Sequence, residues 1–126
     1  LDIGQCIVVR KGVILAIEAI EGTDAAIRRG GSLGKENAVV IKICKPQQDF
    51  RFDLPTIGPQ TIQTMKEVKA CVLVVEAGKT LVLEKERFLK EAREAGIAVV
   101  GHKDDSSENG DVPALGGHRG LPLQKT

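Results

Sequence analysis

Residues 45–59 read KPQQDFRFDLPTIGP and place two acids and an arginine at alternating positions. If this stretch is extended, Asp49, Arg51 and Asp53 share one face, because successive side chains point to opposite sides of an extended backbone. The two phenylalanines between them share the other face, where they can anchor the stretch to an apolar core. We therefore expect the charged side chains to lie together on the exposed side.

This charged face suits a metal ion and a phosphate group. A pair of carboxylates such as Asp49 and Asp53 can bind Mg²⁺, whose shell is usually completed by waters and by phosphate oxygens of a substrate. Arg51 can bind phosphate oxygens as a planar fork, and Lys45 can bind them as a point charge. A salt-bridged surface loop explains the same residues equally well, so the spacing alone does not name a reaction.

A second polar group, EAIEGTD at residues 18–24, follows an apolar run and precedes a predicted helix. It contains Glu18, Glu21, Thr23 and Asp24. The N-terminus of a helix presents free N–H groups, which suits an anion such as phosphate. A simple capping motif is the alternative, with Thr23 as the N-cap and Asp24 favourable to the helix dipole.

The composition is that of an ordinary globular chain and excludes several classes of protein. The 126 residues are 42% hydrophobic, 28% charged and only 2% aromatic, so we expect one domain with an aliphatic core. A net charge of +1 gives no electrostatic reason to expect nucleic acid as a partner. No apolar run approaches the ~20 residues that span a bilayer.

The cysteines and the start of the sequence add two expectations. Cys6, Cys44 and Cys71 each lie in an apolar run, and no C-x-x-C is present. This pattern predicts small buried side chains in a reducing compartment rather than disulfides or a metal site.

The sequence opens at Leu1 without a methionine or a signal peptide and enters patterned structure almost at once. We therefore expect a fragment cut at a domain boundary.

Apolar periodicity and turn residues predict alternating strands and helices. Two β-branched runs around Lys11-Gly12 predict a hairpin. The strands are expected at residues 5–10, 13–20, 38–45, 71–77, 80–83 and 97–101, with the third strand central. The helices are expected from Thr23 to Gly30-Gly31, from Pro59 to about Ala70 and over residues 84–96, with a loop at 32–37.

This order predicts an α/β layered domain, in which a mixed β-sheet is flanked by helices. The domain is expected over residues 1–101. Residues 102–126 lack an apolar period and are expected to form a flexible polar tail. Neither a G-x-G-x-x-G fingerprint nor a Walker loop is present, because Gly30, Gly31 and Gly34 have the wrong spacing and follow a predicted helix.

Four strings carry a resemblance to a known family: DIGQ at the start, EAIEGTDAAIRR, KPQQDFRFDLPTIGP and VEAGKTLVL. In this order they resemble the C-terminal domain of the LpxI-type UDP-2,3-diacylglucosamine pyrophosphatases. The resemblance runs from Asp2 to about Gly101. This sequence departs from the family at Cys6, where a serine is common, and nothing in it corresponds to the family's N-terminal domain.

The resemblance implies an activity and its partners. The reaction would be hydrolysis of the pyrophosphate bond of UDP-2,3-diacylglucosamine to UMP and 2,3-diacylglucosamine 1-phosphate, in the lipid A biosynthesis of Gram-negative bacteria. Mg²⁺ or another divalent cation would be the cofactor. The partners would be a lipid-linked UDP-sugar substrate and the N-terminal domain of the parent protein. The location would be cytoplasmic, with a peripheral contact at the inner membrane and a homo-oligomer left open.

The resemblance also assigns roles to residues of the matching motifs. Asp53 would be the essential acid, with Asp49 as the second metal ligand and Asp24 as a further catalytic acid. The substrate and its phosphates would be bound by Lys45, Arg51, Gln5, Glu21 and Thr23. Whether this domain alone is an enzyme stays open, because a domain that only binds a phospho-ligand or a partner, or a purely structural domain, has the same features.

Overall fold

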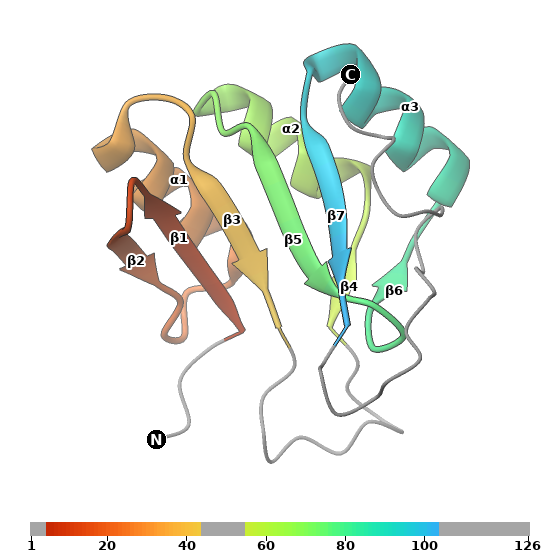
Figure 1. Ribbon diagram of the computed structural model, residues 1–126, viewed down its shortest axis with the longest axis horizontal. Coiled ribbons are helices and arrows are strands. Elements are labelled where there is room, and N and C mark those ends of the chain that lie inside the picture. Colours follow the sequence, from red (N-terminus) through yellow and green to blue (C-terminus); the bar gives the residue numbers. More distant parts are fainter. Residues whose placement is uncertain (1–4, 44–54, 104–126) are drawn as a thin grey trace.

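The computed structural model describes residues 5–43 and 55–103. In this part of the chain a five-stranded mixed sheet carries three helices, and two short strands form a second sheet (Figure 1). This arrangement confirms the predicted α/β layered domain. None of the helices in these two ranges has the length and apolar character needed to cross a membrane.

The first element is the predicted hairpin. β1 (Cys6–Arg10) pairs antiparallel with β2 (Val13–Ile17). Lys11 and Gly12 connect them with φ angles of 53° and 80°. Two positive φ angles are typical of a type I′ turn, whose twist matches that of the paired strands. β2 stops short of its predicted end at residue 20, since the Ala19 N–H donates to a side chain at 2.9 Å instead of to a neighbouring strand.

The five-stranded sheet has the strand order β2-β1-β3-β5-β7. β3 (Val39–Lys42), β5 (Val72–Glu76) and β7 (Ala98–His102) run parallel, whereas β1 is antiparallel to both of its neighbours. β3 occupies the centre, as its apolar sequence predicts. Because only β1 runs in the opposite direction, the carboxyl ends of the other four strands lie at the same edge of the sheet.

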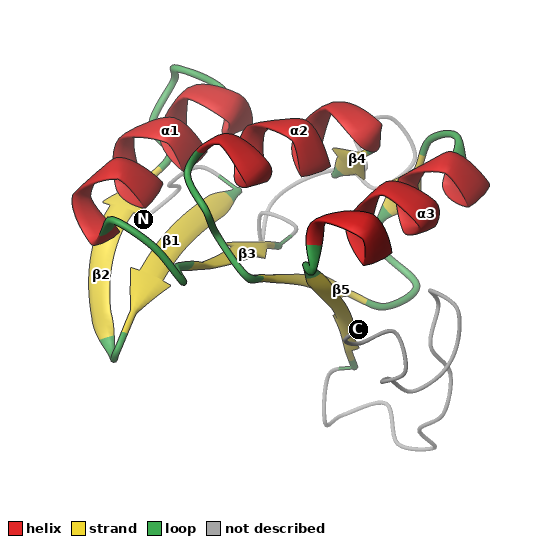
Figure 2. Cartoon of the chain, turned by 90° about the horizontal axis from the view of Figure 1, so that it is seen from above, coloured by secondary structure: helices red, strands yellow, loops and turns green. Residues whose placement is uncertain are grey.

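Three helices cover one face of this sheet, as Figure 2 shows from above. They are α1 (Thr23–Gly34), α2 (Pro59–Glu67) and α3 (Lys85–Ala95). α1 comes after β2, α2 after β3 and α3 after β5. Since these three strands run in one direction, all three helices begin at the same edge of the sheet. The predicted signals are present: proline opens α2, and Gly96 follows α3 with a φ of 74°.

The sequence does not predict the second sheet. β4 (Thr56–Ile57) pairs in parallel with β6 (Leu81–Val82). The N–H of Leu81 donates to the carbonyl of Pro55, and the N–H of Leu83 donates to that of Ile57, both at 2.8 Å. The strand predicted at residues 80–83 therefore forms, but it does not join the main sheet. Because β4 precedes α2 and β6 precedes α3, their pairing ties the starts of these two helices together.

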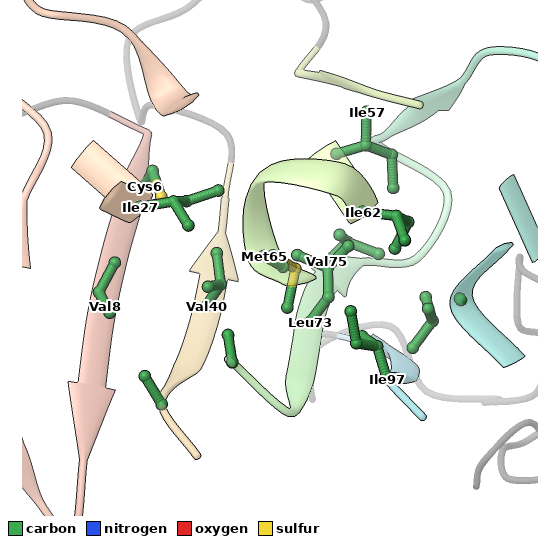
Figure 3. Packing of buried hydrophobic residues seen from close by; sticks show 14 of the residues in the cluster. Cys6, Val8, Ile27, Val40, Ile57, Ile62, Met65, Leu73, Val75 and Ile97 are labelled. Carbon is green, nitrogen blue, oxygen red and sulfur yellow. The ribbon is translucent and has the colours of Figure 1, made fainter. Parts of the chain in front are cut away.

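The core lies between the sheet and the helices and is aliphatic, as the composition predicts (Figure 3). Residues on the helix-facing side of the strands contribute to it, namely Val8, Val40, Leu73 and Val99. The helices contribute Ile27, Ile62, Met65 and Phe88. Burying a side chain of this size contributes roughly 1.5–3 kcal/mol relative to leaving it exposed. This layer therefore holds the helices in place above the sheet.

The predicted end of α1 at Gly30-Gly31 is wrong, because the helix continues to Gly34. Part of the loop predicted at 32–37 is thus helical. A Cβ atom on Gly30 would lie 2.6 Å from Cβ of Val8 and 2.9 Å from Cβ of Ala16. The glycine therefore lets the helix backbone approach β1 and β2 closely. Gly30 is therefore needed for close packing in the middle of the helix and does not mark the end of the helix.

We expect Gly30→Ala to destabilise the fold by about 1–3 kcal/mol, because the added methyl group would overpack the contact with β1 and β2. This effect should outweigh the gain of about 1 kcal/mol that alanine gives over glycine within a helix. Ser32→Ala, at an exposed position of the same helix, is the matched control and should be nearly neutral. Urea unfolding of both variants measures the difference. A Gly30→Ala protein as stable as the parent would contradict the close approach.

Candidate functional site

A cavity of about 600 Å³ lies at the edge of the sheet where the three helices begin. Its wall comes from the starts of α1, α2 and α3, from β4 and from the end of β3. The lining consists of residues 21–25, Lys42, residues 56–61, Leu83, Glu84 and Arg87. The cavity therefore lies at the carboxyl ends of parallel strands, which is where open α/β sheets usually bind ligands.

Both α1 and α2 begin at a glycine that lines this cavity. Gly22 is the N-cap of α1 and Gly58 is the N-cap of α2, and neither glycine has a side chain that could cap its helix. At α2 the Gly58 N–H donates to Oγ1 of Thr61 at 3.5 Å. Gly22 has a φ of 95°, a conformation that favours glycine. Because a helix N-terminus carries partial positive charge, two helix starts in one cavity wall make this edge favourable to an anion.

The structure corrects the predicted role of Thr23. It is not the N-cap, since it occupies the first position of α1 and Gly22 precedes the helix. Its hydroxyl instead donates to Glu18 Oε1 at 3.2 Å. Asp24 lies in the first turn of α1, as predicted, and it has no hydrogen bond or ion pair with another described residue. Asp24 is therefore a carboxylate of the cavity lining that no described residue engages.

Glu21, also a predicted site residue, is held by the protein itself. It accepts a hydrogen bond from the Arg29 guanidinium and another from the Ala19 N–H at 2.9 Å. The hydrogen bond from Arg29, followed by the one from Ala19, lowers the pKa of Glu21 to about 2. Glu21 is thus an ionised acid at the rim of the cavity that fixes the turn before α1.

Lys42 is the cavity residue that sequence reasoning missed. It is the last residue of β3, and only 6% of it is exposed. Its Nζ donates to the carbonyl oxygen of Thr56 at 2.8 Å. Burial lowers the pKa of Lys42 below the ordinary 10.5, and the acidic groups of Cys6, Glu18 and Asp24 oppose this shift. The signal was present in the alternation of VVIK, which puts Lys42 on the same face as the core residue Val40.

Cys6 lies opposite Lys42 in the pairing of β1 with β3 and confirms the prediction of a small buried side chain. It is fully buried, and both Cys6 and the partly buried Cys71 are free thiols. Burial, followed by the charge of Glu18, raises the pKa of Cys6 from 9.0 to about 12. A thiol with so high a pKa is protonated and unreactive at neutral pH.

The raised pKa of Cys6 predicts a loss of stability in alkali. The folded protein binds this proton more tightly than the unfolded chain, so the contribution is complete below pH 9 and is lost as pH rises from 9 towards 12. The expected loss is about 1.4 kcal/mol per pH unit in this window. Cys6→Ala should lack it, while Cys71→Ala, the control, should retain it. Urea unfolding at pH 8, 10 and 11 in reductant compares them, and parallel pH curves for Cys6→Ala and the parent would contradict the shift.

The remaining predicted site residues divide into two groups. Lys45, Asp49, Arg51 and Asp53 lie outside the described residues. Gln5 is described, and its carbonyl oxygen accepts a hydrogen bond from the Ile43 N–H at 2.8 Å, but it does not line the cavity. The structure thus brings Glu21, Thr23 and Asp24 together at the cavity, and Gln5 is not among the residues that line it. The connection that holds the first group begins after β3 and ends before β4, and both of these strands contribute to the cavity wall.

The described residues can be compared with the needs of a divalent cation. No group of three or more His, Cys, Asp or Glu side chains that could hold a metal occurs among them. Of the three carboxylates that line the cavity, Glu21 is engaged by Arg29, and Glu84 is engaged by Arg87 at 3.3 Å. Asp24 alone has no partner among the described residues. Mg²⁺ is often bound by one or two carboxylates plus substrate phosphates, so Asp24 fits such an ion as one ligand of a larger set.

Comparison with known proteins gives two matches. The profile of a family described as the LpxI C-terminal domain matches residues 1–100. A curated relative from Caulobacter vibrioides, UDP-2,3-diacylglucosamine pyrophosphatase LpxI, is 41% identical over 109 residues. The alignment covers 80% of this chain and 39% of the relative, so the chain spans about two fifths of that relative's length.

Proposed function

Since this chain belongs to the LpxI C-terminal domain family, we propose that it supplies the diphosphate-binding part of a UDP-2,3-diacylglucosamine pyrophosphatase. The proposed reaction is hydrolysis of the pyrophosphate bond to UMP and 2,3-diacylglucosamine 1-phosphate in lipid A biosynthesis. One observation carries the proposal. Two motifs far apart in the sequence, EGTD at residues 21–24 and TIGP at residues 56–59, line one cavity together with a buried lysine.

The charge of this cavity supports binding of a diphosphate. The starts of α1 and α2 favour negative charge, and Lys42 adds an ammonium group to the same cavity. Lys45 and Arg51 belong to the connection between β3 and β4, and in this proposal they contribute further positive charge. Their role is to offset the negative charge that develops on the phosphate during hydrolysis.

We propose Asp53 and Asp49 as the ligands of Mg²⁺ or another divalent cation, with Asp24 beside them. Such a cation, when bound, polarises a phosphoryl oxygen and lowers the pKa of a bound water. Asp53 precedes the cavity residue Thr56 by three positions in the sequence, which supports its assignment to this site. Asp53 would act either as a metal ligand or as the base that accepts a proton from the attacking water.

A second function is favoured by one observation. The chain spans 39% of the Caulobacter vibrioides relative, so residues that complete the substrate cleft could belong to the remainder of such a protein. In that case this domain alone would bind a phospho-ligand or a partner without hydrolysing it. Binding without turnover by the isolated chain is the result that this function predicts.

A chimera tests the proposed function. In it, this chain replaces the matching segment of the Caulobacter vibrioides relative, and UMP release from UDP-2,3-diacylglucosamine is measured with Mg²⁺ and with EDTA. We expect turnover with Mg²⁺ and its loss in EDTA. The unmodified relative is the control for substrate and assay. A folded chimera that releases no UMP while the relative does would show that this chain cannot serve as the pyrophosphatase domain.

A further inference from the structure

We propose that Lys42 is a phosphate-binding residue, which contacts the diphosphate in the cavity through N–H groups for which the described part of the chain provides no acceptor. The inference rests on the proposed function for the nature of the anion. It concerns a residue outside the motifs that carry the resemblance to the family. Three observations support it: the burial of Lys42, its incomplete hydrogen bonding, and the two helix starts beside it.

Burial of Lys42 has a cost that packing does not explain. The side chain is 94% shielded from solvent, and it forms no ion pair with a described residue. Burying an ammonium group without an ion-pair partner disfavours its charged form, whereas an apolar side chain of similar length would avoid that cost. A lysine at this position is therefore better explained by a ligand than by the stability of the fold.

The hydrogen bonding of Lys42 is also incomplete. An ammonium group has three N–H donors. One donates to the Thr56 carbonyl at 2.8 Å, and no other described residue accepts a hydrogen bond from Nζ. The remaining donors belong to a side chain that lines the cavity. Phosphate oxygens entering the cavity would accept them, and charge-assisted hydrogen bonds of this kind are the strong ones.

The surroundings of Lys42 favour an anion that arrives with a cation. Gly22 and Gly58, the N-cap residues of α1 and α2, lie in the same cavity wall, where the two helix starts favour negative charge. Asp24 lies there too, and it would repel a bare anion. A diphosphate with a bound divalent cation suits both the positive and the negative groups of the cavity, because its oxygens can face Lys42 while its cation faces the Asp24 carboxylate. Inorganic pyrophosphate with Mg²⁺ is therefore the simplest probe of the site.

The test is a titration of the 126-residue chain with Mg²⁺-pyrophosphate, followed by amide NMR. Lys42→Met removes the charge and keeps the length of the side chain, and Lys66→Met makes the same change at an exposed position of α2. We expect the amides of residues 22–25, 58 and 60–61 to shift in the parent. Lys42→Met should bind about 10- to 100-fold more weakly, with unchanged or higher thermal stability, while Lys66→Met should bind like the parent.

Each outcome decides the proposal. Binding by Lys42→Met as tight as the parent's, or no shift at these amides in the parent, would overturn it. If Lys42→Met does not fold, Lys42→Gln, which keeps a donor for the Thr56 carbonyl, takes its place. If neither variant folds, Lys42 is a structural residue and the proposal is wrong.

The same variant in the chimera separates this inference from the proposed function. An active chimera whose UMP release is unchanged by Lys42→Met would sink the inference and leave the proposed function standing. If the chimera is inactive but the isolated chain binds pyrophosphate in a way that depends on Lys42, the proposed function is wrong and the inference about Lys42 stands. If the chimera is inactive and the isolated chain does not bind pyrophosphate, the cavity is not a phosphate site.

Discussion

Asp53→Ala in the chimera is expected to reduce UMP release by about 10²–10⁴-fold, the usual contribution of a catalytic acid or base. A metal ligand or base that acts on the phosphoryl transition state contributes mainly to rate, so the KM for substrate should change much less than kcat. The free energy of unfolding should stay within about 1 kcal/mol of the parent's, the upper end of what a surface salt bridge typically contributes.

The control for Asp53→Ala is Glu36→Ala, which removes an exposed acid at a residue that does not line the cavity. It should leave both UMP release and unfolding unchanged. If Asp53 were only part of a surface salt bridge, Asp53→Ala would resemble this control. Near-normal turnover, or turnover lost only in step with unfolding, would remove Asp53 from the chemistry.

The isolated 126-residue chain is expected to release little or no UMP from UDP-2,3-diacylglucosamine, even at Mg²⁺ concentrations that saturate the chimera. The chain spans 39% of the relative's length, and hydrolysis needs substrate, water and catalytic groups held in one geometry. Holding reactants in this way supplies about 7–11 kcal/mol of a typical barrier, so even partial loss of a cleft reduces the rate by orders of magnitude.

The comparison of the chain and the chimera at equal concentration measures this effect. Amide NMR of the chain shows whether it is folded in the same buffer, so that inactivity is not confused with unfolding. Turnover by the chain that equals turnover by the chimera would contradict the expectation. That result would also exclude the alternative of a domain that binds without hydrolysing.

Local signals in the sequence predicted most of the elements. The Lys11-Gly12 turn, Pro59 at the start of α2 and Gly96 after α3 each depend on the backbone of a few residues, which local sequence largely determines. The central place of β3 also followed from its apolar composition. These features need no knowledge of distant contacts.

The incorrect or missing predictions concern features that depend on contacts between residues far apart in the sequence. Gly30 was read as a stop signal, but its role is to meet Val8 and Ala16 on two strands, which local sequence does not reveal. β4 has only two residues, and its pairing with β6 depends on where the main sheet places both segments. For the same reason the EGTD motif predicted charged residues at a helix start, but the sequence did not show that Lys42 of β3 lies in the same cavity.

The pairing of β4 with β6 determines when the cavity forms during folding. Each strand has two residues, so their hydrogen bonds alone cannot offset the backbone entropy that is lost when both segments are ordered. α2 and β5 lie between them in the sequence, so pairing the two strands closes a loop that contains both elements. We therefore expect the cavity to form late in folding. A ligand bound there stabilises the finished domain by mass action but cannot help to nucleate it.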